Sequence, residues 1–166
     1  MSESLIVKTK RDGTIKFLDN SGANTYTVAY EAGDLNISIP GPSVISPLDR
    51  GSLGSPPSLR YSDDAPITGS FTAYLRDLGD GAYATLEEII TQTGHVASTW
   101  VSTMGANGEV FTLDLEWTIE GTNHGDASDH VLTLSHCVVS GSLSEGDPDQ
   151  ISISFTSYSV YPSSVT

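Results

Sequence analysis

The chain has few of the features that stabilise or target small proteins. It contains one cysteine, Cys137, among 166 residues, which excludes an intrachain disulfide and a zinc site built from several cysteines. No run reaches the roughly 18–20 apolar residues needed to cross a bilayer. Lys8 and Lys10 interrupt the short apolar run near the start, where a signal peptide would be apolar. We therefore expect no membrane association and a protein that folds in a cytoplasm, or that leaves it by a route that the sequence does not show.

Basic residues are scarce and confined to one part of the chain. Seven Lys and Arg stand against 21 Asp and Glu, giving a formal charge of −14, and no Lys or Arg follows Arg76. Binding to a phosphate backbone or an anionic membrane requires a basic face, so this composition disfavours both. The acids after Arg76 have no basic partner within that half. We expect them to face water, cations or a basic segment of another copy.

The common catalytic and cofactor motifs are absent from the sequence. It has no Gly-rich phosphate loop, no Gly-x-Ser-x-Gly elbow and no His-Glu-x-x-His helix. His124, His130 and His136 are spaced six residues apart near Asp126 and Asp129, a donor set that zinc accepts. Their expected positions on a turn and a strand instead predict solvated histidines.

Three further features have ordinary structural interpretations. The turn from Glu145 to Asp149 lacks the remainder of a twelve-residue calcium loop. Asp114 and Glu116 are neighbours on one strand face, where carboxylates usually share a solvated surface. Cys137 has no basic neighbour and is expected to be a buried, inert thiol. The sequence thus predicts no catalytic residue, no metal and no cofactor, and favours a protein that is not an enzyme.

Alternating apolar and polar residues predict a succession of strands separated by turn signals. The predicted strands are Thr14–Leu18, Thr25–Glu31, Leu35–Ile39, Thr68–Leu75, Val110–Glu120, His130–Ser140 and Gln150–Tyr158. The polar faces of the last two, His130–Ser140 and Gln150–Tyr158, carry Ser and Thr rather than Lys and Glu. Many short strands with one helix indicate a mainly β protein, an antiparallel β-sandwich or barrel.

One flanking helix is predicted over residues 85–93. Thr85-Leu86-Glu87-Glu88 forms a capping box, in which the Thr85 hydroxyl accepts from the Glu88 amide while the Glu88 side chain reaches back. Gly94 suits the position after the helix end. Since this helix is short and amphipathic, it must pack on a sheet.

The early part of the chain predicts a long hairpin and then a long irregular loop. Thr25–Pro40 alternates so that one face of the hairpin is apolar, and Pro40-Gly41-Pro42 ends it. Residues 41–60 follow without periodicity, yet they contain several apolar side chains. Such loops are usually functional or disordered. Both a floppy loop and a loop that orders against a partner are compatible with this pattern.

The order of these elements resembles a known family. The strand Thr68–Leu75 leads into the capped helix, Trp100-Val101-Ser102-Thr103 precedes Phe111–Glu120, and His130–Ser140 runs on to Ser144-Glu145-Gly146-Asp147-Pro148 before a last Ser-rich strand. Over residues 25–160 this order is similar to the major tail (tail tube) proteins of long-tailed bacteriophages. It is more distantly similar to the tube subunit of type VI secretion.

The resemblance implies a structural virion protein rather than a catalyst. It implies one tail-tube-like domain over residues 1–166, with an interaction loop at 41–60, that forms hexameric rings stacked head to tail in the tail of a virion assembled in the bacterial host cytoplasm. The implied partners are other copies of the chain, a tape measure protein and tail-end (terminator) proteins. Double-stranded DNA would pass through the tube without specific binding.

Two sets of residues become candidates under this resemblance. The expected subunit contacts are Tyr26, Val28, Tyr30, Leu35, Ile37, Ile39, Leu48, Arg50, Leu53 and Arg60. The expected lumen-facing acids are Asp114, Glu116 and Glu120, because an acidic wall repels duplex DNA, which carries about one negative charge per 1.7 Å.

A binding module is the alternative interpretation of the same strands. A carbohydrate-binding or adhesin-like β-sandwich is also rich in Ser and Thr, and it normally clusters exposed aromatic residues on one face. Trp100 and Trp117 instead fall at positions expected to be packed. The sequence therefore favours the tail protein.

Overall fold

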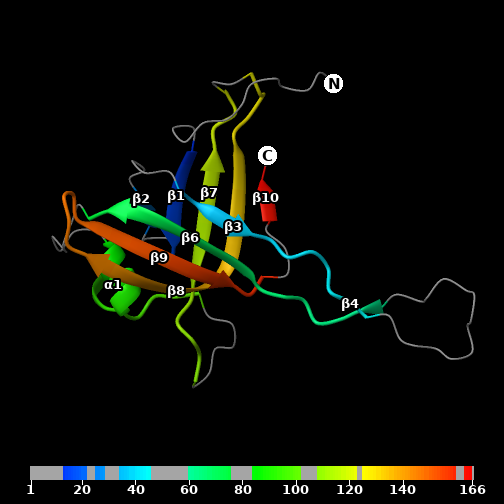
Figure 1. Cartoon of the computed structure of the whole chain (residues 1–166), viewed down its shortest axis with the longest axis horizontal. Coiled ribbons are helices and arrows are strands. Elements are labelled where there is room, and N and C mark those ends of the chain that lie inside the picture. Colours follow the sequence, from blue (N-terminus) through cyan, green and yellow to red (C-terminus); the bar gives the residue numbers. More distant parts are fainter. Residues whose placement is uncertain are drawn as a thin grey trace, which may run out of the picture.

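The computed structural model describes residues 13–21, 25–28, 34–45, 60–75, 84–101, 108–122, 125–159 and 163–165, without the side chains of 45, 60 and 163–165. The strands are β1 (Gly13–Leu18), β2 (Thr25–Val28), β3 (Asn36–Ser38), β4 (Val44–Ile45), β5 (Arg60–Tyr61), β6 (Ile67–Tyr74), β7 (Leu113–Ile119), β8 (His130–Ser144), β9 (Gln150–Ser157) and β10 (Ser163–Val165). The helical elements are α1 (Leu86–Thr91) and a 3₁₀ turn, η1 (Gly94–Val96). The mainly β fold with one short helix is confirmed (Figure 1).

One antiparallel sheet makes up the body of the molecule. Its strand order is β2-β1-β7-β8-β9-β6-β3, and β10 pairs with β8. The first part of β8 pairs with β7 and the last part pairs with β9, so this 15-residue strand belongs to two layers. The rings of Phe17 on β1 and Phe71 on β6 lie 6.0 Å apart. The sheet therefore folds over on itself, with β1 and β7 facing β9 and β6.

β8 turns from one layer to the other at a β-bulge. Leu115 pairs with Leu134 and Leu113 pairs with Cys137, so two residues of β8, Ser135 and His136, lie opposite one residue of β7. His136 has a left-handed backbone, with φ 54°. An inserted residue bends a strand and increases its twist, which is what a strand shared by two layers requires.

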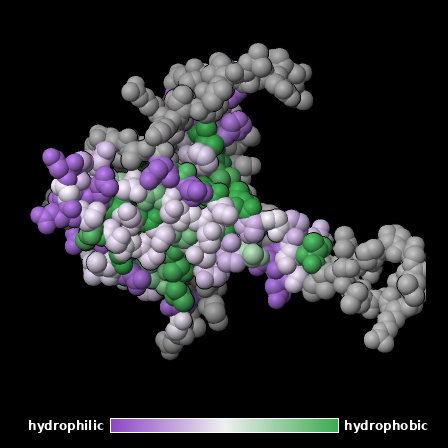
Figure 2. Space-filling view, viewed as in Figure 1, coloured by the Kyte–Doolittle hydropathy of each residue, from purple (hydrophilic) through white to green (hydrophobic). Residues whose placement is uncertain are grey.

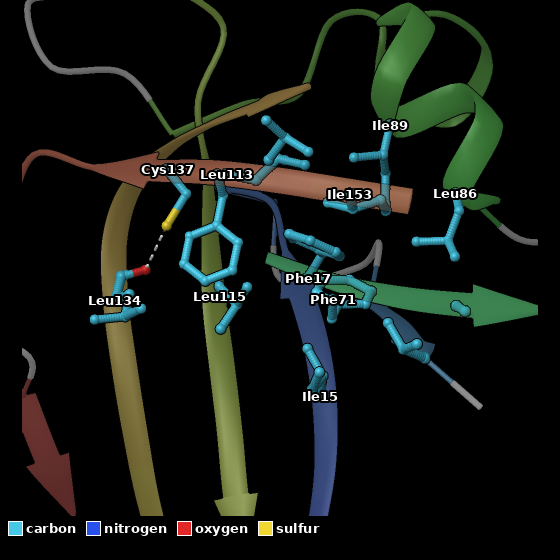
Figure 3. Packing of buried hydrophobic residues seen from close by; sticks show 14 of the residues in the cluster. Ile15, Phe17, Phe71, Leu86, Ile89, Leu113, Leu115, Leu134, Cys137 and Ile153 are labelled. Atoms are coloured by element: carbon cyan, nitrogen blue, oxygen red, sulfur yellow. Dashed lines mark hydrogen bonds between the residues drawn. The ribbon is translucent and has the colours of Figure 1, made fainter. Parts of the chain in front are cut away.

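The core lies between the two layers. It contains Ile15 and Phe17 from β1, Leu113 and Leu115 from β7, and many residues from the other strands, and α1 inserts Leu86 and Ile89 at one end (Figure 3). Each fully buried aliphatic or aromatic side chain of this kind contributes about 1.5–3 kcal/mol to folding. The alternation in the sequence thus marks the side chains of each strand that point into this core.

The helix confirms the predicted capping box and corrects the predicted end. The Thr85 hydroxyl accepts from the Glu88 amide, and Glu88 Oε2 accepts from the Thr85 amide. The residue after the helix is Gln92, which takes the left-handed conformation at φ 57°. Gly94 is also left-handed, at φ 60°, but it begins η1. Two adjoining turns, rather than one terminal glycine, therefore reverse the chain.

The predicted hairpin over residues 25–40 is wrong. β2 pairs with β1, while β3 pairs with β6, and the two strands lie at opposite ends of the sheet order. Alternation identifies a half-buried strand but carries no information about its partner. The link between β2 and β3, with Tyr30, lies outside the described residues.

The predicted loop at 41–60 begins and ends in a small ladder. Val44 pairs with Tyr61 and Ile45 pairs with Arg60. This β4–β5 ladder stands well away from the main sheet (Figure 1). Leu48, Arg50 and Leu53 lie outside the described residues.

Candidate functional site

The outer face of the first layer carries an ion pair between the two halves of the sequence. Lys16 on β1 is the register partner of Glu116 on β7, and its Nζ lies 3.2 Å from Glu116 Oε1. We expected acids after Arg76 to meet only water, cations or another copy. That expectation is wrong for Glu116, because β1 and β7 come from different halves and are paired in the sheet.

Asp114, the next outward carboxylate of β7, supports the bulge. Its Oδ1 accepts a hydrogen bond from the His136 amide at 3.0 Å. This amide belongs to the residue that interrupts the ladder, so the carboxylate replaces a missing strand partner. Glu120 is half-buried just beyond the end of β7. The three expected lumen acids thus lie on or beside one strand, and Asp114 and Glu116 tie that strand to β8 and β1.

The outer face of the second layer is different in composition. We call it the hydroxyl face after its Ser and Thr residues, which are Thr68, Ser70, Thr72, Ser140, Ser142, Ser144, Ser152, Ser154 and Thr156. Val138, Gln150 and Tyr74 share this face near the ends of the paired segments. Pairing aligns these residues in rows across the strands, as in Ser140, Ser154 and Ser70. The hydroxyls of Ser140 and Ser154 lie 2.9 Å apart. Figure 2 shows this side of the molecule, with pale, weakly polar residues across its middle.

The hydroxyl face is hollowed rather than flat. A depression of about 510 Å³ is lined by Ser70, Thr72, Ser152 and their neighbours, with Asp34 on its border. Asp34 Oδ1 accepts from the Thr72 amide at 2.8 Å, beyond the end of the β3 ladder. Asp34 is the charged residue among those that line it.

Both edges of the second layer have unused pairing capacity. Within the described residues, β8 beyond Cys137 pairs with β9 alone, and β3 pairs with β6 alone. The edge part of β8 reads Val-Val-Ser-Gly-Ser-Leu-Ser, without the Lys or Pro that usually protects an edge strand. Each edge is a template for another strand.

The expected contact residues have divergent environments. Val28 is buried in the core of this chain at 3% exposure, while Tyr26, Leu35 and Ile37 are partly buried against that core. Ile39, at 52% exposure, is open to solvent. Arg60 is a strand residue of β5.

The β4–β5 ladder exposes apolar residues that the sequence did not single out. Val44 is 54% exposed and Tyr61 is 79% exposed. They are register partners and so share one face of the ladder. The apolar content of residues 41–60 indicated a contact surface in this region. Only the strand pairing shows that Val44 and Tyr61 lie together.

The remaining candidates support no reactive site. His130 begins β8 and His136 occupies the bulge, and no group of three metal-binding side chains occurs in the part of the chain that the structure describes. Cys137 is buried as expected, and burial is the main cause that raises its pKa to about 12. The thiol is therefore protonated at neutral pH. In the turn after β8, Asp149 Oδ1 accepts from the Gly146 amide at 2.8 Å, as in ordinary turns.

Comparison with known proteins finds similarity at the level of the fold. No protein-family model matches the sequence, and no curated protein matches it. Among solved structures, the fold is similar to a chain in the cryo-EM structure of the anti-feeding prophage baseplate, 6-fold symmetrised, with a TM-score of 0.60 and 10% identity. The match covers 99% of this chain and 97% of that chain. This chain thus has a fold similar to that of a chain in this baseplate.

The helical elements α1 and η1 are short. Among the described residues, none of them combines the length and apolar character that crossing a bilayer requires.

Proposed function

We propose that this chain is a structural subunit of a phage tail-like particle. In this proposal six copies form a ring, rings stack head to tail into a tube, and double-stranded DNA passes through its channel. The observation that carries the proposal is the similarity over 99% of the chain to a component of a baseplate solved with 6-fold symmetry. The role is structural rather than enzymatic, and the place of the protein is the virion tail.

The two free edges supply a means of closing a ring. In the proposed ring, the edge of β8 beyond Cys137 accepts β3 of the next copy, so that the second layers of six copies make one continuous barrel. Closure of a sheet satisfies the backbone groups that an exposed edge leaves unpaired. Ile37 and Ile39 belong to this contact because they lie on and beside β3.

The β4–β5 ladder supplies a second contact, between rings. A ladder of two residue pairs with exposed Val44 and Tyr61 gains little stability alone, since isolated two-stranded hairpins are marginal in water. We propose that it orders against the adjacent ring, together with Leu48, Arg50, Leu53 and Arg60. Such a contact joins different surfaces of two copies, which is the arrangement that produces open filaments.

The charge of the chain suits a channel through which DNA passes better than a protein that binds DNA. With a formal charge of −14 and no Lys or Arg after residue 76, the protein repels a polyanion. DNA transit without specific binding follows from this charge. A tape measure protein inside the tube and tail-end proteins at its limits are the further partners we propose.

Negative-stain electron microscopy with light scattering tests the proposal. Purified protein should form rings or tubes, and deletion of residues 43–58 should abolish stacking while the circular dichroism spectrum and unfolding midpoint of the domain are preserved. Replacing that segment with a polar linker of equal length is the matched control for chain length. A strictly monomeric protein with affinity for glycans would contradict the proposal and favour the binding module.

A further inference from the structure

We infer that the hydroxyl face, and not the carboxylates of β7, forms the wall of the channel. This inference rests on the proposed function and deepens it by naming the surface that passing DNA meets. Asp114 and Glu116 would then lie on the side of the subunit that faces away from the DNA.

The first argument is topological. The edges available for pairing between copies, β3 and the end of β8, both belong to the second layer. The second layer is therefore the one that continues around a ring. Its inner side is covered by the core, by β1 and β7, and by α1. These extra elements need a larger circumference than the barrel itself, so they fit on its outside, which leaves the hydroxyl face inside.

The shape of the hydroxyl face agrees with this orientation. The depression of about 510 Å³ lies on it, across β6, β9 and the end of β8. In a ring of six copies, a hollowed surface that faces inward encloses a channel. If the same surface faced outward, the first layer of each copy would instead occupy the inside of the barrel.

The chemistry of the face is that of a non-adhesive wall. Along β6, β8 and β9 the described part of this face offers mainly small neutral hydroxyls and no Lys or Arg, the groups that hold nucleic acid by charge. Its aromatic ring, Tyr74, lies at the end of β6, away from the rows of Ser and Thr. Hydrogen bonds from Ser and Thr to phosphates position a nucleic acid but carry no information about its base sequence. DNA therefore meets a hydrated surface without Lys or Arg side chains that would displace the counterions of its phosphates.

The carboxylates near this face lie at its borders. Asp34 borders the depression, and Glu145 and Asp147 lie in the turn that ends the β8–β9 hairpin. Each ring would thus present the carboxylates of the β8–β9 turn at one rim and, beside β3, one Asp34 per copy in an otherwise uncharged wall. This differs from a wall lined by Asp114, Glu116 and Glu120.

The buried native thiol makes cysteine labelling a clean test. Because Cys137 is fully buried with a pKa of about 12, it gives little background with maleimides at neutral pH. Ser152→Cys and Ser154→Cys place a thiol on the exposed hydroxyl face, and Thr14→Cys places one at an exposed position of the first layer. Each is labelled with a small maleimide and with a bulky polyethylene-glycol maleimide, as free subunits and as tubes.

The expected result is protection that depends on position and on reagent size. In free subunits all three variants react with both reagents. In tubes, Ser152→Cys and Ser154→Cys should react with the bulky reagent at least about tenfold more slowly, while the small reagent still reaches them and Thr14→Cys is unchanged. Tubes that protect Thr14→Cys instead, or that protect none of the three, would overturn this inference and leave the proposed function standing. Failure of the native chain to form any ring or tube would overturn the proposed function itself.

Discussion

At the scale of single residues, the turn after α1 depends on the lack of a side chain at Gly94. Glu88 closes the capping box, and its carboxylate also lies 3.1 Å from Nδ1 of His95. A Cβ at Gly94 would stand 1.9 Å from Glu88 Oε1, and the backbone there is left-handed at φ 60°. One glycine thus gives Glu88 the space to serve both the helix start and the following turn.

Gly94→Ala should therefore destabilise the domain by about 2 kcal/mol or more, from a left-handed alanine at about 1–2 kcal/mol and a disturbed cap at about 1 kcal/mol. Urea unfolding followed by circular dichroism measures the change. Gly41→Ala is the matched control, because a Cβ there meets nothing within 4 Å and its backbone is not left-handed, so its effect should stay within about 0.5 kcal/mol. Equal effects of the two substitutions would contradict this account.

At the scale of elements, the bulge in β8 decides the architecture. His136 is the left-handed residue of the bulge, its amide is held by Asp114, and its carbonyl accepts from the Tyr158 amide at 3.3 Å. Next to it, the Ser157 hydroxyl donates to the Ser135 carbonyl at 2.7 Å. Side chains and a neighbouring strand thus satisfy the backbone groups that the bulge removes from the ladder, which lets one strand serve both layers.

The stability of variants at position 136 should depend on how well the new residue tolerates a left-handed backbone, and not on its propensity for β-strands. We expect His136→Gly to be more stable than His136→Val by about 1–2 kcal/mol, because a β-branched residue is strained in the left-handed region. Thr133, in the regular part of β8, is the control, and there Val should be more stable than Gly. Denaturant midpoints of the four variants give the comparison. If the Val variant is more stable than the Gly variant at both positions, the bulge does not have the conformation described.

At the scale of the whole molecule, net charge opposes the association that the fold invites. Sheet edges that lack a partner among the described residues, and the exposed apolar residues of the β4–β5 ladder, favour contact between copies. A formal charge of −14 on every copy repels them. Association is then a balance between short-range pairing and long-range repulsion, and only the repulsion is strongly screened by salt.

Assembly should therefore increase with ionic strength. Raising sodium chloride from about 10 mM to about 150 mM shortens the screening length from about 30 Å to about 8 Å, and we expect the fraction of protein in rings or tubes to rise. Sedimentation velocity or light scattering measures that fraction, with circular dichroism at each salt concentration to verify unchanged folding. Assemblies that dissociate as salt is added would show that attraction between opposite charges, rather than strand pairing, holds the copies together.

Sequence alone determined the local features of this protein. The strands around Ile15, Leu115 and Ile153, the capping box of Thr85 and Glu88, and the burial of Cys137 all follow from alternation and from side-chain chemistry within a few residues. These features depend on neighbours along the chain, so their signals are present in any short window. The Ser and Thr positions that make up the hydroxyl face were visible in the same way.

Only the tertiary structure decided which distant segments meet. It separated β2 from β3, bent β8 at His136, and brought Lys16 to Glu116 across 100 residues. Many alternating segments of this chain could pair with one another, because each candidate partner satisfies the same local pattern. The choice among them depends on the shared core and on chain connectivity, which is why the edges and faces that we propose for assembly could not be assigned from the sequence.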